Sequence, residues 1–129
     1  MSGDPVWHAG ACHCGSVRIA ALAPADLQLL ECNCSMCARS AYLHLIVQAH
    51  EFRLVAGAEA LAEYRFGTGV AKHRFCRHCG ARPYYVPRSH PHGYSVNARC
   101  LDPATITSMT IRPYDGQNWD TARTALDAR

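Results

Sequence analysis

Seven of the eight cysteines in this 129-residue chain fall into three short clusters. The clusters are Cys12-His-Cys14-Gly15, Cys32-Asn-Cys34-Ser-Met-Cys37 and Phe75-Cys76-Arg-His-Cys79-Gly80. Zinc in proteins prefers four ligands in a tetrahedron, and the C-x-C and C-x-x-C spacings let one turn of backbone direct two sulfurs at one ion. Seven thiolates divide naturally into a closed site of four ligands and an open site of three, whose free position can take part in chemistry.

A disulfide framework is the alternative use of so many cysteines, and three observations count against it. The N-terminal segment Met1–Gly10 has no apolar run, so we do not expect a secretory signal peptide. We therefore expect a cytoplasmic, reducing environment, in which structural disulfides are rare. Eight cysteines are about 6% of the residues, below the content typical of disulfide scaffolds. A C-x-C pair is also poorly placed for a bridge between its own two cysteines.

The charge and hydropathy of the chain argue against two classes of partner. The formal net charge is +3 with neutral cysteines, but seven thiolates subtract seven charges and two zinc ions add four, which leaves zero. The cationic residues are also scattered, so we expect no nucleic-acid partner. The longest apolar stretch, Ala41–Val47, is far shorter than the ~20 residues that cross a membrane, so we expect no membrane partner.

Hydrophobic alternation predicts a small, mainly β, single domain with very little helix. The expected strands are Ser16–Ala21, Tyr42–Gln48, Phe52–Val55, Ala60–Phe66, Val70–Phe75, Ala81–Val86, Tyr94–Arg99 and Met109–Tyr114. In the first of these, Val17 and Ile19 share one side and Arg18 lies on the other. We interpret Leu22–Leu30 as a loop followed by a strand. Helix is expected only as a turn or two over Asp102–Ile106, which begins with an N-cap and a proline, and as one turn after Cys37 through Arg39.

The closed site is predicted to consist of Cys12, Cys14, Cys76 and Cys79. In both pairs a glycine follows the second cysteine, and glycine adopts a positive φ without penalty, as such a knuckle requires. A C-x-x-C pair can also be a redox pair beside a βαβ unit, but here strands are expected on both sides. The closed site would therefore tie the N-terminal strand to a distant hairpin.

The open site is predicted to consist of Cys32, Cys34 and Cys37, which we also expect to be the catalytic residues. Possible protein ligands for the fourth position are Cys100, His44, His73, His90 and His92. Cys100 is otherwise expected to be a small buried residue. Zinc with three thiolates is a weak Lewis acid and a poor activator of water, compared with three-histidine sites. It is better suited to binding a thiol and keeping the sulfur nucleophilic, so the ligand set favours thiol chemistry over hydrolysis.

The three motifs in this order resemble the glutathione-dependent formaldehyde-activating family, which also includes centromere protein V. The matching segments are Cys12–Val17, Cys32–Cys37, Phe75–Gly80, Val96–Asp102 and Tyr114–Trp119. The resemblance implies a zinc-bound β-tent fold of several antiparallel strands, as in a Rab-exchange-factor-like superfamily. It implies a structural zinc on Cys12, Cys14, Cys76 and Cys79, and a second zinc on Cys32, Cys34 and Cys37 at which glutathione sulfur binds. It extends over nearly the whole chain, with a domain core of about residues 8–119 and a C-terminal tail at 120–129.

Two functions follow from this interpretation. In the first, the protein is a carbon–sulfur lyase-type enzyme that joins a thiol such as glutathione to a small aldehyde such as formaldehyde, giving S-hydroxymethylglutathione. Arg39 and the loop Arg88–Gly93 would then orient the anionic thiol carrier. In the second, the same scaffold is a non-catalytic glutathione carrier or a protein-interaction module. The sequence predicts no oligomeric state.

Overall fold

The computed structural model describes residues 3–118 and has ten β-strands and one α-helix in that range. The strands are β1 (Pro5–Ala11), β2 (Arg18–Pro24), β3 (Asp26–Cys32), β4 (Leu43–Gln48), β5 (Phe52–Ala56), β6 (Leu61–Tyr64), β7 (Lys72–Cys76), β8 (Tyr84–Val86), β9 (Gly93–Asn97) and β10 (Ser108–Tyr114). The helix α1 is Ser35–Ser40, and the remaining helical turns are 3-10 turns of three residues each. The expectation of a mainly β protein is confirmed.

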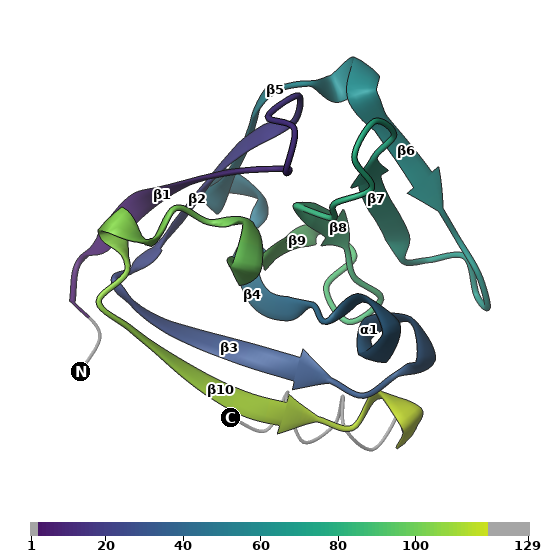
Figure 1. Ribbon diagram of the computed structural model, residues 1–129. Helices are drawn as coiled ribbons and strands as arrows, with labels where there is room; N and C mark the ends of the chain where they lie inside the picture. The colour runs from purple at the N-terminus through teal and green to yellow at the C-terminus, as the bar shows by residue number, and fades with distance from the viewer. Residues whose placement is uncertain (1–2, 119–129) are drawn as a thin grey trace.

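The strands form two sheets (Figure 1). The smaller sheet has the order β1-β2-β5, and both of its pairings are antiparallel. The larger sheet has the order β10-β3-β4-β9-β8-β7-β6. Strand β10 runs parallel to β3 along their whole length, and the other pairings are antiparallel. The larger sheet therefore brings the chain's last described strand against the strand that ends at Cys32.

One hydrophobic core joins the two sheets. Alternate residues of β2 are buried, as the period-2 pattern predicted, with Val17 and Ile19 inside and Arg18 exposed. Leu27 and Leu29 of β3 and the apolar side chains of β4 complete its centre. Strand β4 is buried on both faces, which explains why its apolar residues do not alternate with exposed ones; its polar His44 is buried as well.

Several predicted boundaries were wrong. Strand β1 was not predicted because its Gly10 and Pro5 weaken the strand pattern, and pairing with β2 overrides that local preference. Residues Leu22–Pro24 continue β2 instead of forming a loop. The expected strand Ala81–Val86 begins only at Tyr84, after Pro83. The N-cap of α1 is Cys34, so this helix starts before Cys37 and contains it. Trp119 and the predicted tail 120–129 lie outside the described residues.

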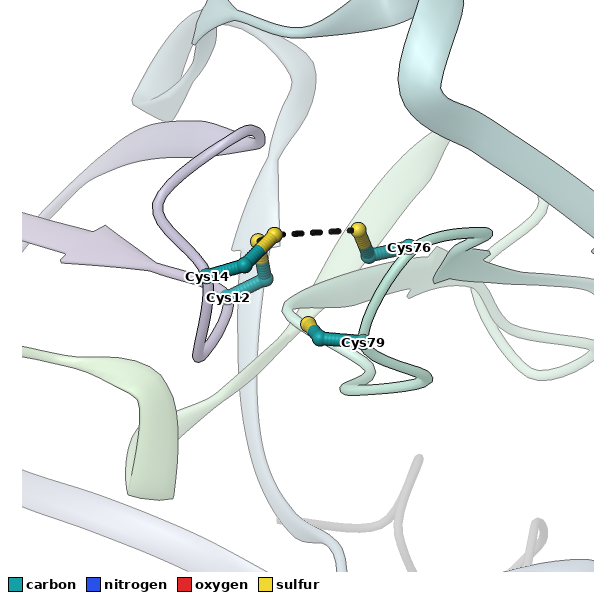
Figure 2. A group of neighbouring side chains, drawn as sticks. All are labelled: Cys12, Cys14, Cys76 and Cys79. Carbon is teal, nitrogen blue, oxygen red and sulfur yellow. Dashed lines mark hydrogen bonds between the residues drawn. The ribbon is translucent and has the colours of Figure 1, made fainter.

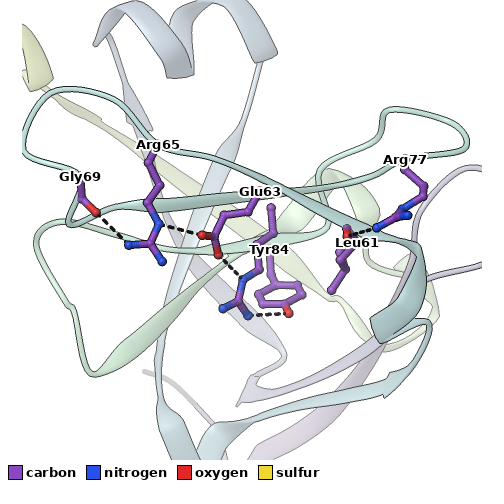
Figure 3. A network of polar contacts seen from close by, with 7 residues as sticks. Leu61, Glu63, Arg65, Gly69, Arg77 and Tyr84 are labelled. Atoms are coloured by element: carbon purple, nitrogen blue, oxygen red, sulfur yellow. Dashed lines mark hydrogen bonds and ion pairs between the residues drawn. The ribbon is translucent and has the colours of Figure 1, made fainter.

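Polar contacts stabilise the β6–β7 hairpin at the edge of the larger sheet (Figure 3). Glu63 pairs with Arg65 at 2.7 Å and with Arg74 at 3.4 Å, and Arg74 donates a hydrogen bond to the Tyr84 hydroxyl at 3.0 Å. Arg77 donates to the carbonyl of Leu61. These contacts hold β6 against its neighbours. Arg65 also donates to the carbonyl of Gly69 at 3.4 Å, within the loop between β6 and β7 that carries Phe66. Among residues 3–118 no helix is long and apolar enough to cross a membrane.

Candidate metal centres

The sulfurs of Cys12, Cys14, Cys76 and Cys79 converge on one point, as the sequence predicted (Figure 2). All four Sγ atoms lie within 4.8 Å of one another. The Sγ atom of Cys14 is 3.6 Å from that of Cys12 and 3.7 Å from that of Cys76. A tetrahedron with zinc–sulfur bonds of about 2.3 Å places its sulfurs ~3.8 Å apart. The four-cysteine cluster therefore fits a closed zinc site.

Local backbone geometry creates each half of the four-cysteine cluster. Gly15 and Gly80 have φ angles of +80° and +79°, in the left-handed region that favours glycine. These turns direct backbone N–H groups at the sulfurs, as in the hydrogen bonds from Val17 to Cys12 Sγ at 3.3 Å and from His78 to Cys76 Sγ at 3.4 Å. Backbone hydrogen bonds from Ala81 and Cys14 lower the pKa of Cys79 to about 6, which favours the thiolate that a metal requires.

The four-cysteine cluster connects the two sheets. Cys12 and Cys14 lie in the turn between β1 and β2 of the smaller sheet. Cys76 ends β7, and Cys79 lies in the turn that leads to β8 of the larger sheet. A metal held by these residues would therefore act as a cross-link between segments more than sixty residues apart.

The second group of converging sulfurs comes from Cys32, Cys34 and Cys37, whose Sγ atoms also lie within 4.8 Å of one another. Cys32 ends β3, Cys34 caps α1, and Cys37 lies one turn into the helix. The backbone N–H groups of Cys34 and Cys37 point at the sulfurs of Cys32 and Cys34, at 3.5 and 3.3 Å. Within the described part of the chain, no histidine or carboxylate joins this three-cysteine cluster.

The segment after β10 packs directly against the three-cysteine cluster. A Cβ atom on Gly116 would lie 2.4 Å from the Sγ of Cys32 and 2.9 Å from the Cβ of Cys34. The Asn33 side chain donates to Asp115 at 3.0 Å and accepts from the backbone N–H of Gln117 at 3.1 Å. The resemblance had included this segment, and the structure shows that it supports the C-x-C turn from outside.

The three sulfurs compete for protons. Hydrogen bonds from Cys32 and Cys37 lower the pKa of Cys34, whereas contacts with Cys32 and Cys34, together with burial, raise the pKa of Cys37. The cluster thus prefers one thiolate, on Cys34. A divalent cation supplies the positive charge that lets all three ionise, so the donor set fits a soft divalent metal such as zinc.

His44 supports the three-cysteine cluster as a neighbour and is not part of the ligand group. Its Nε2 atom is 3.2 Å from Cys37 Sγ, and its Nδ1 atom is 2.8 Å from the hydroxyl of buried Ser95. With Cys37 as thiolate, Nε2–H donates to sulfur and Nδ1 accepts from Ser95. This is the usual arrangement of an outer residue that orients a metal ligand. Burial lowers the pKa of His44 to about 4, which keeps the ring neutral.

A cavity of about 170 Å³ opens beside the three-cysteine cluster, and all three cysteines line it. Its other walls are largely apolar or aromatic and include Phe66, Tyr85 and Tyr114. Arg88 and Ser89, from the loop predicted to orient a thiol carrier, lie on its rim. A vacant coordination position on a metal at the cluster would therefore face a partly open space of small-molecule size.

A buried cation lies behind this cavity. The side chain of Arg82 is 9% exposed and donates from Nη1 to Ser40 at 2.5 Å and from Nη2 to His73 Nδ1 at 2.7 Å. Its guanidinium also lies over the rings of Tyr42 and Tyr85. Among residues 3–118 Arg82 forms no ion pair with a carboxylate. Burial and the Arg82 charge lower the pKa of His73 to about 4.

Other predicted site residues lie elsewhere. Arg39 does not line the cavity, because its guanidinium donates to the backbone carbonyl of Ser35 at 2.9 Å. His90 and His92 are in neither ligand group and do not line the cavity. Cys100 is partly buried, and its thiol contacts the backbone carbonyl of Arg82 at 3.7 Å. Arg82, Ser95 and Gly116 were not predicted, because their proximity to the site depends on strand pairing between distant segments.

The fold and both clusters define a small, mainly β protein with two cysteine clusters that could each hold a metal ion, one of four sulfurs and one of three beside a cavity. The family model described as "Glutathione-dependent formaldehyde-activating enzyme" matches residues 7–117, so the chain belongs to that family. A crystal structure of a Rhodobacter sphaeroides protein is also similar. It shares 35% sequence identity and a TM-score of 0.66, and the match covers 81% of this chain and 99% of that one.

Proposed function

We propose that the protein joins a thiol such as glutathione to a small aldehyde such as formaldehyde, at a zinc held by Cys32, Cys34 and Cys37. The single observation that carries this proposal is the placement of the three cysteines on the wall of one cavity. Membership of the formaldehyde-activating family supports the choice of thiol and aldehyde. Zinc with three thiolates supplies a site that lowers the pKa of a fourth thiol while leaving its sulfur nucleophilic.

The charge of Arg82 supports an anionic centre at this position. A guanidinium stays protonated at all accessible pH values, and a buried cation without a counter-ion is costly. No carboxylate among the described residues pairs with Arg82. A divalent ion with three thiolates carries a net negative charge, and the Cys34 charge already affects the pKa of His73, which Arg82 contacts. The negative centre would therefore offset the buried guanidinium.

The dimensions of the cavity set how the two reactants fit. One water needs about 10–15 Å³ of cavity volume, so a cavity of about 170 Å³ accommodates an aldehyde as small as formaldehyde together with the sulfur end of a thiol. The remainder of a tripeptide would extend past the rim, where Arg88 and Ser89 lie.

Loss of free formaldehyde in the presence of glutathione tests this proposal. Thiols add to formaldehyde without help, so the zinc-loaded protein must exceed the uncatalysed rate. Cys34→Ser should remove the acceleration, because it removes one ligand and the preferred thiolate of the cluster. Cys100→Ser is the matched control, because Cys100 is in neither cluster, and it should retain the rate. Full activity of Cys34→Ser would refute the assignment.

The alternative, a carrier without catalysis, gives a different result in the same experiment. Titration calorimetry would then show glutathione binding that depends on Cys34, while the rate of aldehyde loss stays at the uncatalysed value.

A further inference from the structure

Arg82 determines which ring nitrogen of His73 carries a hydrogen. The Nη2 atom of Arg82 and the Nδ1 atom of His73 are 2.7 Å apart. A guanidinium has only donors, so Nδ1 must be the acceptor in this hydrogen bond. A neutral imidazole that accepts at one nitrogen carries its hydrogen on the other. His73 is therefore held as the tautomer with Nε2–H.

The orientation of the His73 ring is fixed on both faces. The ring stacks between Phe66, with centroids 5.2 Å apart, and Tyr85, with centroids 4.7 Å apart. The interplanar angles are 20° and 12°, so both contacts are nearly parallel. Arg82 is itself held by the Ser40 hydroxyl and by the Tyr42 ring. A flip of the His73 ring would therefore break its hydrogen bond with Arg82 and is costly.

The other ring nitrogen of His73, Nε2, carries a hydrogen and can donate one hydrogen bond. His73 is 4% exposed and lines the same cavity as Cys32, Cys34 and Cys37. Within residues 3–118 no hydrogen bond involves Nε2 of His73. Nε2 of His73 is not among the fully buried atoms that lack a partner, so its N–H reaches the space of the cavity, where the oxygen of a ligand can replace water as the acceptor.

We propose that the Nε2–H of His73 donates a hydrogen bond to the aldehyde oxygen while the thiol sulfur adds to the carbonyl carbon. This inference deepens the proposed function and rests on it. The carbon–sulfur bond forms as the carbonyl π bond breaks, and that electron pair moves to oxygen. The thiol loses its proton to solvent on binding, and the oxyanion later takes a proton from water. His73 is then a catalytic residue, and Arg82 is a positioning residue that acts through it.

His73 acts here as a hydrogen-bond donor and not as a general acid. Burial and the neighbouring guanidinium lower its pKa to about 4, so the ring is neutral near pH 7. A neutral N–H group aimed at a developing oxyanion requires no proton transfer and little reorganisation in an enclosed site. Removing one such donor from an oxyanion site typically costs about 10²–10³ in rate.

The tautomer can be measured independently of activity. Long-range ¹H–¹⁵N correlation spectra of the zinc-loaded protein should show hydrogen on Nε2 of His73. Arg82→Met removes the donor to Nδ1, so the spectrum should show a mixture of the two neutral tautomers in exchange with each other. Arg77→Met, which removes a surface guanidinium that contacts only the Leu61 carbonyl, should leave the spectrum unchanged. Hydrogen on Nδ1 in the wild-type protein would overturn the inference.

Two substitutions of His73 test its contribution to rate. His73→Phe keeps a ring between Phe66 and Tyr85 but removes the donor, so we expect formaldehyde loss to slow about 100-fold while zinc content and glutathione affinity stay constant. His73→Gln offers an oxygen to Arg82 and an N–H group to the cavity, so it should recover at least about ten-fold of that loss. Equal rates for wild type and His73→Phe would overturn the proposal.

The outcomes separate this inference from the proposed function. If the wild-type protein does not exceed the uncatalysed rate, both fail. If the wild type accelerates the reaction and His73→Phe does so equally, only the role of His73 fails. Should His73→Phe not fold because Arg82 loses its acceptor, the wild-type tautomer and the rate of Arg82→Met relative to Arg77→Met decide the question.

Discussion

Gly116 shows how one missing side chain determines the shape of the three-cysteine cluster. A methyl group at this position would overlap the sulfur of Cys32. We therefore expect Gly116→Ala to displace the C-x-C turn and to lower the zinc content from two ions to one per chain, while the four-cysteine cluster keeps its ion. Gly3→Ala, where a Cβ meets nothing within 4 Å, is the control and should retain both ions. Two tightly bound ions in Gly116→Ala would show that the turn tolerates the methyl group.

His73 is expected to make stability depend on pH. Its folded pKa of about 4 lies below the unfolded value of about 6.5, so the unfolded chain binds more protons between these values. The contribution of the neutral His73 ring to the free energy of unfolding is complete above pH 6.5. It is lost as the pH falls toward 4, by up to about 1.4 kcal/mol per pH unit. Because the pKa of His44 is also lowered to about 4, His73→Gln should reduce, but not abolish, the pH dependence of the urea-unfolding free energy measured between pH 7 and 5. Surface His50→Gln controls for loss of an imidazole, and equal slopes in wild type and His73→Gln would contradict the argument.

At the scale of elements, β10 supports the site through its pairing with β3. Beyond the end of β10, the Asn33 side chain bonds to Asp115 and Gln117 and so closes the segment over the C-x-C turn. Asn33→Ala should lower the free energy of unfolding by about 1 kcal/mol, since both hydrogen bonds are exposed, and should weaken zinc at the three-cysteine cluster more than at the other. Chelator competition measures this difference. Gln28→Ala, on an exposed position of β3, should change neither quantity.

The sequence predicted local patterns well and long-range contacts poorly. The alternation around Val17 and Ile19 and the cysteine spacings are local, so the strand and each short cysteine motif could be inferred. That Cys12 and Cys14 meet Cys76 and Cys79 followed from matching the number of sulfurs to the four ligands of zinc. The contact of Arg82 with His73 could not be, because it depends on the register of the β7–β8 hairpin and on the position of α1. Strand β1 was missed for a similar reason: its pairing partner, and not its own composition, makes it a strand.

At the scale of the whole molecule, metal ions bound at the two cysteine clusters would have different consequences for stability. The four-cysteine cluster connects two sheets, whereas the three-cysteine cluster comes from the six residues Cys32–Cys37, where β3 leads into α1. A structural zinc contributes about 10–16 kcal/mol in small zinc-binding peptides, and a whole domain is stable by only about 5–15 kcal/mol. Loss of the first ion should therefore unfold the protein, and loss of the second should leave the fold intact.

A graded chelator titration separates these two events. The ion with three protein ligands and an exposed fourth position should leave first, with circular dichroism and melting temperature nearly unchanged and the rate of aldehyde addition lost. The second ion should leave only with the collapse of the β signal, because its removal separates the β1–β2 turn from the β7–β8 hairpin. Cys76→Ser should reproduce the second event and Cys37→Ser the first. If both ions left together with unfolding, the three-cysteine centre would be as essential to the fold as the other, and the division into one structural and one reactive ion would be wrong.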